Sequence, residues 1–146
     1  MATAVVARLE TEDARTAAGR DDSRLRDGEA LLRWASAGHP PPVVLRTDGS
    51  VTALDGAPAD MLLGVDPETR REDRAVVLDP GDTVLLYTDG LVERRNRDID
   101  AGTDELIAVL QKCAGLSLDE LCDGVLARMF LPDAEDDVAL LAVRLT

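Results

Sequence analysis

The sequence is poor in aromatic and basic side chains. It has one Trp, one Tyr and one Phe among 146 residues, and Lys112 is its only lysine. Binding of nucleic acids relies on clustered Lys and Arg, and base-stacking platforms need several aromatic rings. Acidic residues number 29 against 16 basic ones, which gives a net charge of −13. The composition therefore argues against a nucleic-acid partner.

Long apolar runs and cysteine-based frameworks are also missing. No run approaches the roughly 18 apolar residues of a membrane span, so we expect no membrane insertion. The N-terminus lacks a basic region followed by an apolar segment, so we expect no secretory signal and a cytoplasmic location. Cys113 and Cys122 have no histidine near them and fit neither a zinc site nor a disulfide framework, so we expect buried free thiols.

The remaining pattern predicts a mixed α and β fold in a single domain over residues 1–146. The Asp48-Gly49 dipeptide predicts a hairpin, and residues 79–82 (DPGD) predict a second one between the strands on either side. Residues 10–29 are polar and predict a long exposed connection. Strands are expected at residues 4–9, 31–37, 43–46, 51–54, 75–78, 83–87 and 138–145.

Two adjacent helices are expected before the last strand. Thr103 is predicted to cap the first, which ends at Gly115. Ser117 and Glu120 have the spacing of a capping box at the start of the second. With mostly antiparallel strands, this arrangement indicates the α+β class.

Acidic residues occur where two of the expected strands meet loops. Asp89 follows the apolar strand 83–87, and Gly90 after it lets another group approach the backbone closely. Asp136 and Asp137 close an acidic run that directly precedes the last strand. Hard cations such as Mg²⁺ and Mn²⁺ prefer carboxylate oxygens, so these acids are candidate metal ligands. The alternative is that all of them are ordinary turn residues.

His39 is the single histidine and is a candidate phosphate contact, because its side chain titrates near neutrality. Its place between Gly38 and three prolines favours another role, in which it holds the loop through a backbone hydrogen bond. The sequence contains no P-loop, no G-x-G-x-x-G and no G-x-S-x-G motif.

Three segments together resemble the SpoIIE-type branch of the metal-dependent (PPM) serine/threonine protein phosphatases. Residues 31–42 (LLRWASAGHPPP) are similar to that family's (Y/W)-A-(N/S)-A-G-H-P-P stretch. Residues 78–93 (LDPGDTVLLYTDGLVE) are similar to L-x-P-G-D-x-(L/V)-(L/V)-L-Y-T-D-G-(L/V)-x-E, and residues 136–141 (DDVALL) are similar to D-D-(M/V)-T-(L/V)-(L/V). The three occur in the family's order at plausible separations, and the resemblance covers the chain from Ala2 to its end.

This resemblance implies an antiparallel β-sandwich with flanking helices, a partial PPM-like α-β-β-α sandwich. It implies hydrolysis of phosphoserine or phosphothreonine on a regulatory protein, typically an anti-anti-sigma factor, at a site with two Mn²⁺ or Mg²⁺ ions. Asp89 and Asp136 carry over as metal ligands, with Asp137 as the second choice in the closing motif. Gly90 carries over as the residue that lets the backbone pass close to the site.

The chain also departs from the family pattern. The upstream D-(V/I)-x-G-H-G segment, which supplies further ligands, is not in the sequence. Ala139 stands where relatives usually have Thr or Ser. We therefore expect an incomplete metal centre with little turnover by this chain alone, and exposed sheet edges that favour a partner, a homodimer or aggregation.

Three hypotheses follow from these observations. The first is a SpoIIE-type phosphatase represented by the C-terminal part of its domain. The second is a catalytically inactive truncated relative that acts as a protein-binding regulator. The third is an acidic structural domain in which Asp89 and Asp136 are turn residues.

Overall fold

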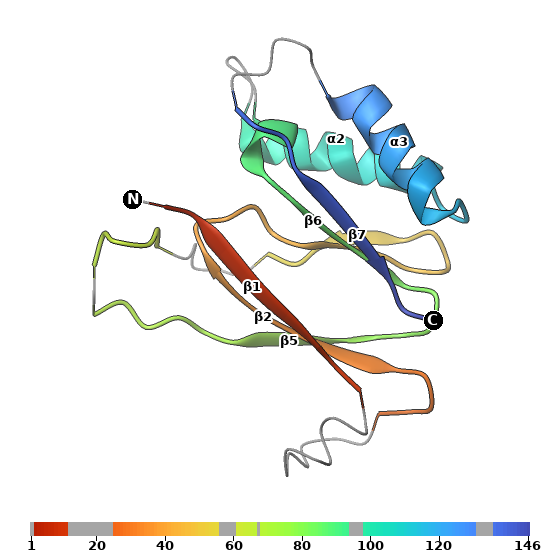
Figure 1. Cartoon of the computed structure of the whole chain (residues 1–146), viewed down its shortest axis with the longest axis horizontal. Helices are drawn as coiled ribbons and strands as arrows, with labels where there is room; N and C mark the ends of the chain where they lie inside the picture. The colour runs from red at the N-terminus through yellow and green to blue at the C-terminus, as the bar shows by residue number, and fades with distance from the viewer. Residues whose placement is uncertain (1, 12–24, 56–60, 67, 94–97, 131–135) are drawn as a thin grey trace. The chain divides into compact units, whose positions relative to one another are not determined.

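The chain forms two compact units, each built around one antiparallel sheet (Figure 1). The computed structural model describes residues 2–11, 25–55, 61–66, 68–93, 98–130 and 136–146. The first unit comprises Met1–His39, Gly56–Gly81 and Leu145–Thr146. The second unit comprises Pro40–Asp55 and Asp82–Arg144.

The sheet of the first unit has three strands in the order β1-β2-β5. These are β1 (Ala4–Glu10), β2 (Ala30–Ala37) and β5 (Arg74–Leu78). Leu32 and Trp34 of β2 are buried, as expected for the central strand. β1 lies at an edge, where the side chain of Val6 is 71% exposed. In the described part of the chain, no other strand pairs with β1 on that side. The expectation of an exposed sheet edge is therefore met here.

Glu10 corrects the prediction that residues 10–29 form an exposed connection. It is the last residue of β1 and is buried. Its carboxylate lies 3.5 Å from Nε of Arg8 and 3.4 Å from Nε of Arg33, and a buried carboxylate needs such cationic partners. Residues 12–24 of the predicted connection lie outside the described residues.

The second unit contains a four-stranded sheet and both helices. The strands are β3 (Val43–Leu45), β4 (Val51–Ala53), β6 (Thr83–Tyr87) and β7 (Leu140–Arg144), in the order β4-β3-β6-β7. A short 3₁₀ turn, η1 (Asp89–Leu91), follows β6. The helices α2 (Ile99–Lys112) and α3 (Leu118–Met129) lie side by side, as Figure 1 shows.

The core of the second unit lies between its sheet and the two helices. Alternate strand residues such as Val43, Leu85 and Tyr87 point toward this core. The neighbouring Val44 and Val84 face the other side of the sheet and are also buried. The prediction that residues 84–87 form a strand buried on both faces is confirmed for Val84, Leu85 and Tyr87, whereas Leu86 is half-buried. The helix residues of the core are Leu106, Val109, Leu110, Cys113, Leu121, Val125 and Met129.

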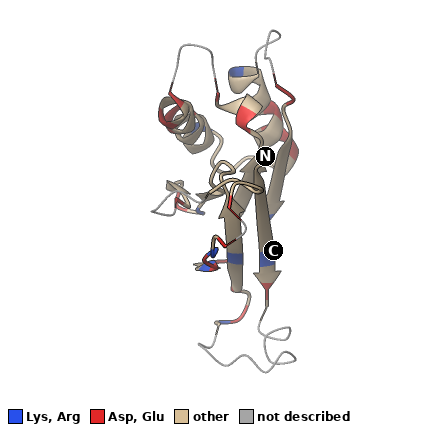
Figure 2. Ribbon diagram, turned by 90° about the vertical axis from the view of Figure 1, so that its left-hand side faces the viewer, with Lys and Arg blue, Asp and Glu red and all other residues tan. Residues whose placement is uncertain are grey.

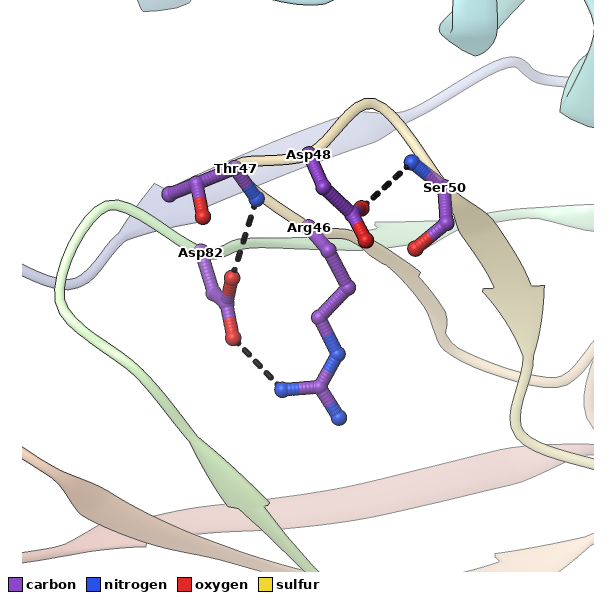
Figure 3. Close-up of polar contacts among 5 residues, drawn as sticks. All are labelled: Arg46, Thr47, Asp48, Ser50 and Asp82. Carbon is purple, nitrogen blue, oxygen red and sulfur yellow. Dashed lines mark hydrogen bonds and ion pairs between the residues drawn. The ribbon is translucent and has the colours of Figure 1, made fainter.

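One of the two predicted hairpins is confirmed and the other is wrong. β3 and β4 form the hairpin at Asp48-Gly49. β5 does not pair with β6, because β5 pairs with β2 whereas β6 pairs with β3 and β7. The buried carboxylate of Asp82 holds the start of β6 in the second unit: it accepts hydrogen bonds from Nη1 of Arg46 at 2.6 Å and from the amide of Thr47 at 3.2 Å (Figure 3).

Local capping rules predicted one helix start well and the other poorly. The capping box of α3 is confirmed, since Ser117 and Glu120 exchange both of its hydrogen bonds. For α2 the N-cap is Asp98, and Thr103 lies inside the helix. The Thr103 hydroxyl donates to the carbonyl of Ile99 at 3.1 Å, which is a common alternative for a threonine within a helix.

The outer surfaces of the helices are acidic, as the red segments in Figure 2 show. Asp104 of α2 and Asp119 and Asp123 of α3 are exposed. Both cysteines are free thiols; Cys113 is buried as expected, whereas Cys122 is half-buried. Burial, together with the charges of Asp119 and Asp123, raises the pKa of Cys122.

The structure confirms the α+β class, with two antiparallel sheets and two helices among the described residues. The last strand is shorter than predicted and begins at Leu140. Neither helix in the described ranges has the length and apolar character that crossing a bilayer requires.

The side chain of Tyr87 predicts a transition at alkaline pH. Burial, reinforced by the charge of Asp55 and opposed by a hydrogen bond with Thr103, raises the pKa of Tyr87 to about 12, from an ordinary value of about 10. The unfolded chain loses this proton first, so the stabilisation is full below pH ~10 and is lost as the pH rises toward ~12. Because Tyr87 is the only tyrosine, tyrosinate absorbance of the folded chain should titrate near 12. A midpoint near 10 in the folded protein would contradict this.

Candidate metal centre

The two acidic segments singled out in the sequence meet at one end of the second unit's sheet. β6 and β7 run antiparallel, with Tyr87 opposite Leu140, so the end of β6 lies beside the start of β7. The pairing continues one residue further, where the amide of Thr88 donates to the carbonyl of Ala139 at 3.1 Å. Asp89 and the pair Asp136 and Asp137 therefore leave the sheet at the same end.

Thr88 links these two segments through its side chain as well. Its hydroxyl accepts a hydrogen bond from the amide of Ala139 at 2.8 Å and donates one to the carbonyl of Asp137 at 2.9 Å. Sequence reasoning assigned no role to Thr88. Its position next to Asp89 at a strand end was visible, but its partners lie about fifty residues away in the sequence.

Asp89 begins the η1 turn and is half-buried. Its main-chain carbonyl accepts hydrogen bonds from the amides of Val92 at 2.9 Å and Glu93 at 2.7 Å. Oδ1 accepts from the amide of Gly90 at 2.9 Å. These bonds fix the backbone that carries the carboxylate.

Gly90 lies against the backbone of the second acidic segment. A Cβ atom at this position would lie 2.8 Å from the carbonyl oxygen of Asp137 and 2.9 Å from that of Asp136. Real Cβ atoms essentially never approach a backbone oxygen so closely. The absence of a side chain thus lets the turn after β6 and the segment before β7 come together.

Gly102 is a second glycine in close contact with backbone, and sequence reasoning did not identify it. It lies inside α2, and a Cβ atom there would overlap the carbonyl oxygen of Val92, two residues after Gly90. Helix α2 therefore packs directly on the backbone of the turn that carries Asp89. Its signal in the sequence was only a glycine within a helical pattern, which has a packing reason in many proteins.

The acidic residues at this end of the sheet carry oxygen atoms of the kind that hard cations bind. Asp89 is half-buried and Asp136 and Asp137 are exposed, so all three carboxylates are accessible to solvent. Mg²⁺ and Mn²⁺ are bound by such oxygens, often with several waters retained. Among the described residues no group of three or more His, Cys, Asp or Glu side chains is arranged to hold a metal. The ligand roles of these acids therefore stay predictions.

His39 belongs to the first unit and is half-buried. Its Nδ1 lies 3.2 Å from the hydroxyl of Thr3, and its carbonyl accepts a hydrogen bond from the Ser36 hydroxyl at 3.3 Å. The loop-holding role expected of this histidine stays a prediction. A phosphate contact by this side chain stays a prediction.

The whole chain also matches a known family. The sequence profile of Stage II sporulation protein E (SpoIIE) matches residues 2–146. The chain belongs to the SpoIIE family. The resemblance drawn from the three motifs is therefore confirmed.

Several solved structures are similar to this SpoIIE-family chain. The RsbU and RsbW domains of a Mycobacterium tuberculosis protein match with a TM-score of 0.64 and 34% identity, over 78% of this chain and 32% of that one. A Bacillus subtilis SpoIIE structure contains the PP2C phosphatase domain and a fragment of the regulatory domain. It matches with a TM-score of 0.58 and 20% identity, over 78% of this chain and 34% of that one. The SiaA-PP2C domain of Pseudomonas aeruginosa matches with a TM-score of 0.54 and 19% identity, over 80% of this chain and 51% of that one.

These matches show that this chain shares the fold of PP2C phosphatase domains. The chain spans about a third of the length of the first two structures and about half of the third.

Proposed function

We propose that this chain is the C-terminal part of a metal-dependent protein serine/threonine phosphatase domain, with Asp89 and Asp136 as cation ligands. One observation carries the proposal: the strand exit at Asp89 and the strand entry at Asp136 lie side by side, with Gly90 in contact with the backbone of the second segment. Asp137 is the alternative ligand from that segment. The D-x-x-G-H-G segment that supplies further ligands in relatives is not in this sequence.

The chemistry assigned to this site is hydrolysis of a phosphate monoester. Mn²⁺ or Mg²⁺, when bound, neutralises phosphoryl oxygens and lowers the pKa of a bound water. The carboxylates of Asp89 and Asp136 would hold the ion, and the hydrogen bonds of the η1 turn keep the backbone of Asp89 in place. Such a fixed backbone reduces the reorganisation needed when the ion binds.

The substrate class proposed is a phosphorylated regulatory protein, with an anti-anti-sigma factor as the specific candidate. The 34% identity to a structure that holds RsbU and RsbW domains supports a regulatory partner, and the SpoIIE structure likewise includes a regulatory fragment. The exposed edge at β1 supports a homodimer or a partner protein on that side of the first unit. We also propose that the protein acts in the cytoplasm.

Calorimetric titration with Mn²⁺ tests the cation site. The wild-type chain should bind in the micromolar range, and Asp89→Asn should weaken binding at least about tenfold because the ion loses a charged oxygen ligand. Asp136→Asn and Asp137→Asn, measured separately, show which of these two acids is the ligand.

The matched control is Asp104→Asn, which removes the same charge from the exposed surface of α2. It should leave the Mn²⁺ affinity within about twofold of wild type, since exposed charges are screened by salt. No heat with the wild-type chain, or equal losses in Asp89→Asn and Asp104→Asn, would refute a specific site.

A further inference from the structure

Thr88 is placed where a single hydroxyl group spans the two acidic segments. It is the N-cap residue of η1, yet its side chain makes no capping hydrogen bond within that turn. A threonine at an N-cap ordinarily accepts a hydrogen bond from an amide in the first turn of its own helix. Here the hydroxyl bonds instead to the segment that precedes β7.

Both hydrogen-bonding functions of this hydroxyl are used on that segment. It donates to the carbonyl of Asp137 and accepts from the amide of Ala139, while the amide of Thr88 donates to the carbonyl of Ala139. Three hydrogen bonds therefore join one residue of the β6 exit to two residues of the β7 entry. The residue before Asp89 is tied to the residues that immediately follow Asp136.

The Ala139 position gives this link added weight. Ala139 has no hydroxyl of its own with which to orient the neighbouring carboxylates. The Thr88 hydroxyl accepts a hydrogen bond from the Ala139 amide at 2.8 Å, so it acts on the backbone beside these carboxylates. Asp136 and Asp137 are both exposed, so these backbone hydrogen bonds act on a segment whose acidic side chains are open to solvent.

We propose that Thr88 is a positioning residue for the cation site: its hydroxyl holds the backbone of Asp136 and Asp137 at a set separation from Asp89. The proposal rests on the cation site proposed above. It identifies the residue that sets the distance between the two ligand-bearing segments of that site. Thr88 does not touch the ion; it acts through the backbone of the ligand-bearing segment.

Two substitutions separate the hydroxyl from the shape of the side chain. Thr88→Val keeps the branched shape and removes both side-chain hydrogen bonds, whereas Thr88→Ser keeps the hydroxyl. Amide hydrogen exchange at Ala139, followed by NMR on the full chain without metal, should be about tenfold faster in Thr88→Val. The same rate in Thr88→Ser should stay within about threefold of wild type.

Mn²⁺ titration of the same proteins is the second readout. The Mn²⁺ affinity should fall at least about fivefold in Thr88→Val and return to near the wild-type value in Thr88→Ser. Ser117→Ala is the matched control, because it removes a hydroxyl from the α3 cap in the same unit. It should change neither the Mn²⁺ affinity nor the exchange rate at Ala139 beyond any general effect on stability.

The outcomes distinguish this inference from the proposed function. If the wild-type chain binds Mn²⁺ and Thr88→Val binds it equally well, the positioning role is refuted while the cation site stands. If Ala139 exchanges at the wild-type rate in Thr88→Val, the hydroxyl does not hold this segment and the inference is overturned. If the wild-type chain binds no Mn²⁺, the proposed function fails, and the positioning role toward the ion fails with it.

Discussion

Gly102→Ala is expected to lower the free energy of unfolding by about 3 kcal/mol. The added methyl group would overlap the carbonyl oxygen of Val92 and lie 2.8 Å from its carbonyl carbon. A backbone group cannot rotate away as a flexible side chain can, so either α2 or the turn after η1 must move. The intrinsic preference of helices for alanine offsets only about 1 kcal/mol of this cost. Chemical denaturation followed by circular dichroism measures the change.

Gly124→Ala is the matched control for this prediction. Gly124 also lies inside a helix, α3, but the nearest atom to its added Cβ is the side-chain sulfur of Cys113 at 3.1 Å. That contact is tight, but it involves a side chain that can shift. The free energy of unfolding should therefore stay within about 1 kcal/mol of wild type. Equal effects of the two substitutions would show that α2 does not pack rigidly on Val92.

Arg46→Met is expected to be the other substitution with a large effect, lowering the free energy of unfolding by about 3 kcal/mol. The carboxylate of Asp82 is buried, with 1% of its side chain exposed, and lies 2.6 Å from Nη1 of Arg46. Removing one partner of a buried ion pair leaves a charge that is poorly solvated, which costs about 3–5 kcal/mol in measured cases. Arg46 is partly exposed, so the expected loss lies at the lower end of that range.

A double substitution tests the cause of this effect. Adding Asp82→Asn to Arg46→Met removes the buried charge and keeps an oxygen that can accept the hydrogen bond from the Thr47 amide. The double variant should be more stable than Arg46→Met alone, with a coupling between the two positions of about 1–2 kcal/mol. Additive losses would mean that the charge of Asp82 is not what Arg46 stabilises.

Asp48 provides the comparison within the same loop. Its carboxylate is exposed and accepts a hydrogen bond from the amide of Ser50 at 2.8 Å (Figure 3). Hydrogen bonds from Ser50 hold the pKa of Asp48 below its ordinary value. Because this contact is local and open to water, Asp48→Asn should leave the unfolding midpoint close to that of wild type.

Local patterns predicted those features whose partners lie nearby in the sequence. The capping box of Ser117 and Glu120 and the hairpin at Asp48-Gly49 each involve residues within a few positions of one another. The wrong prediction of the second hairpin had a distant cause. The DPGD turn looked like a hairpin, but a buried contact between Asp82 and Arg46, 36 positions away, holds β6 in the other sheet.

In the candidate metal centre, too, local patterns identified some residues, whereas residues with distant partners were missed. Asp89, Asp136 and Asp137 were identified from their places at strand ends and from a family resemblance that the whole-chain match confirmed. Thr88 and Gly102 were not identified. A hydroxyl or a missing side chain has no consequence in the sequence until the backbone that it meets is known.

The sequence by itself determined the α+β class, the family, most strand positions and the acids at the strand ends, because alternation, capping and turn rules act over short stretches of chain. Only the tertiary structure decided which strands pair and that the exit of β6 adjoins the entry of β7. It also decided that Thr88 and Gly90 contact the segment before β7, and that Gly102 lets α2 pack on Val92. The physical reason is that register and close packing depend on contacts between residues far apart in the chain, whose identities do not reveal that they meet.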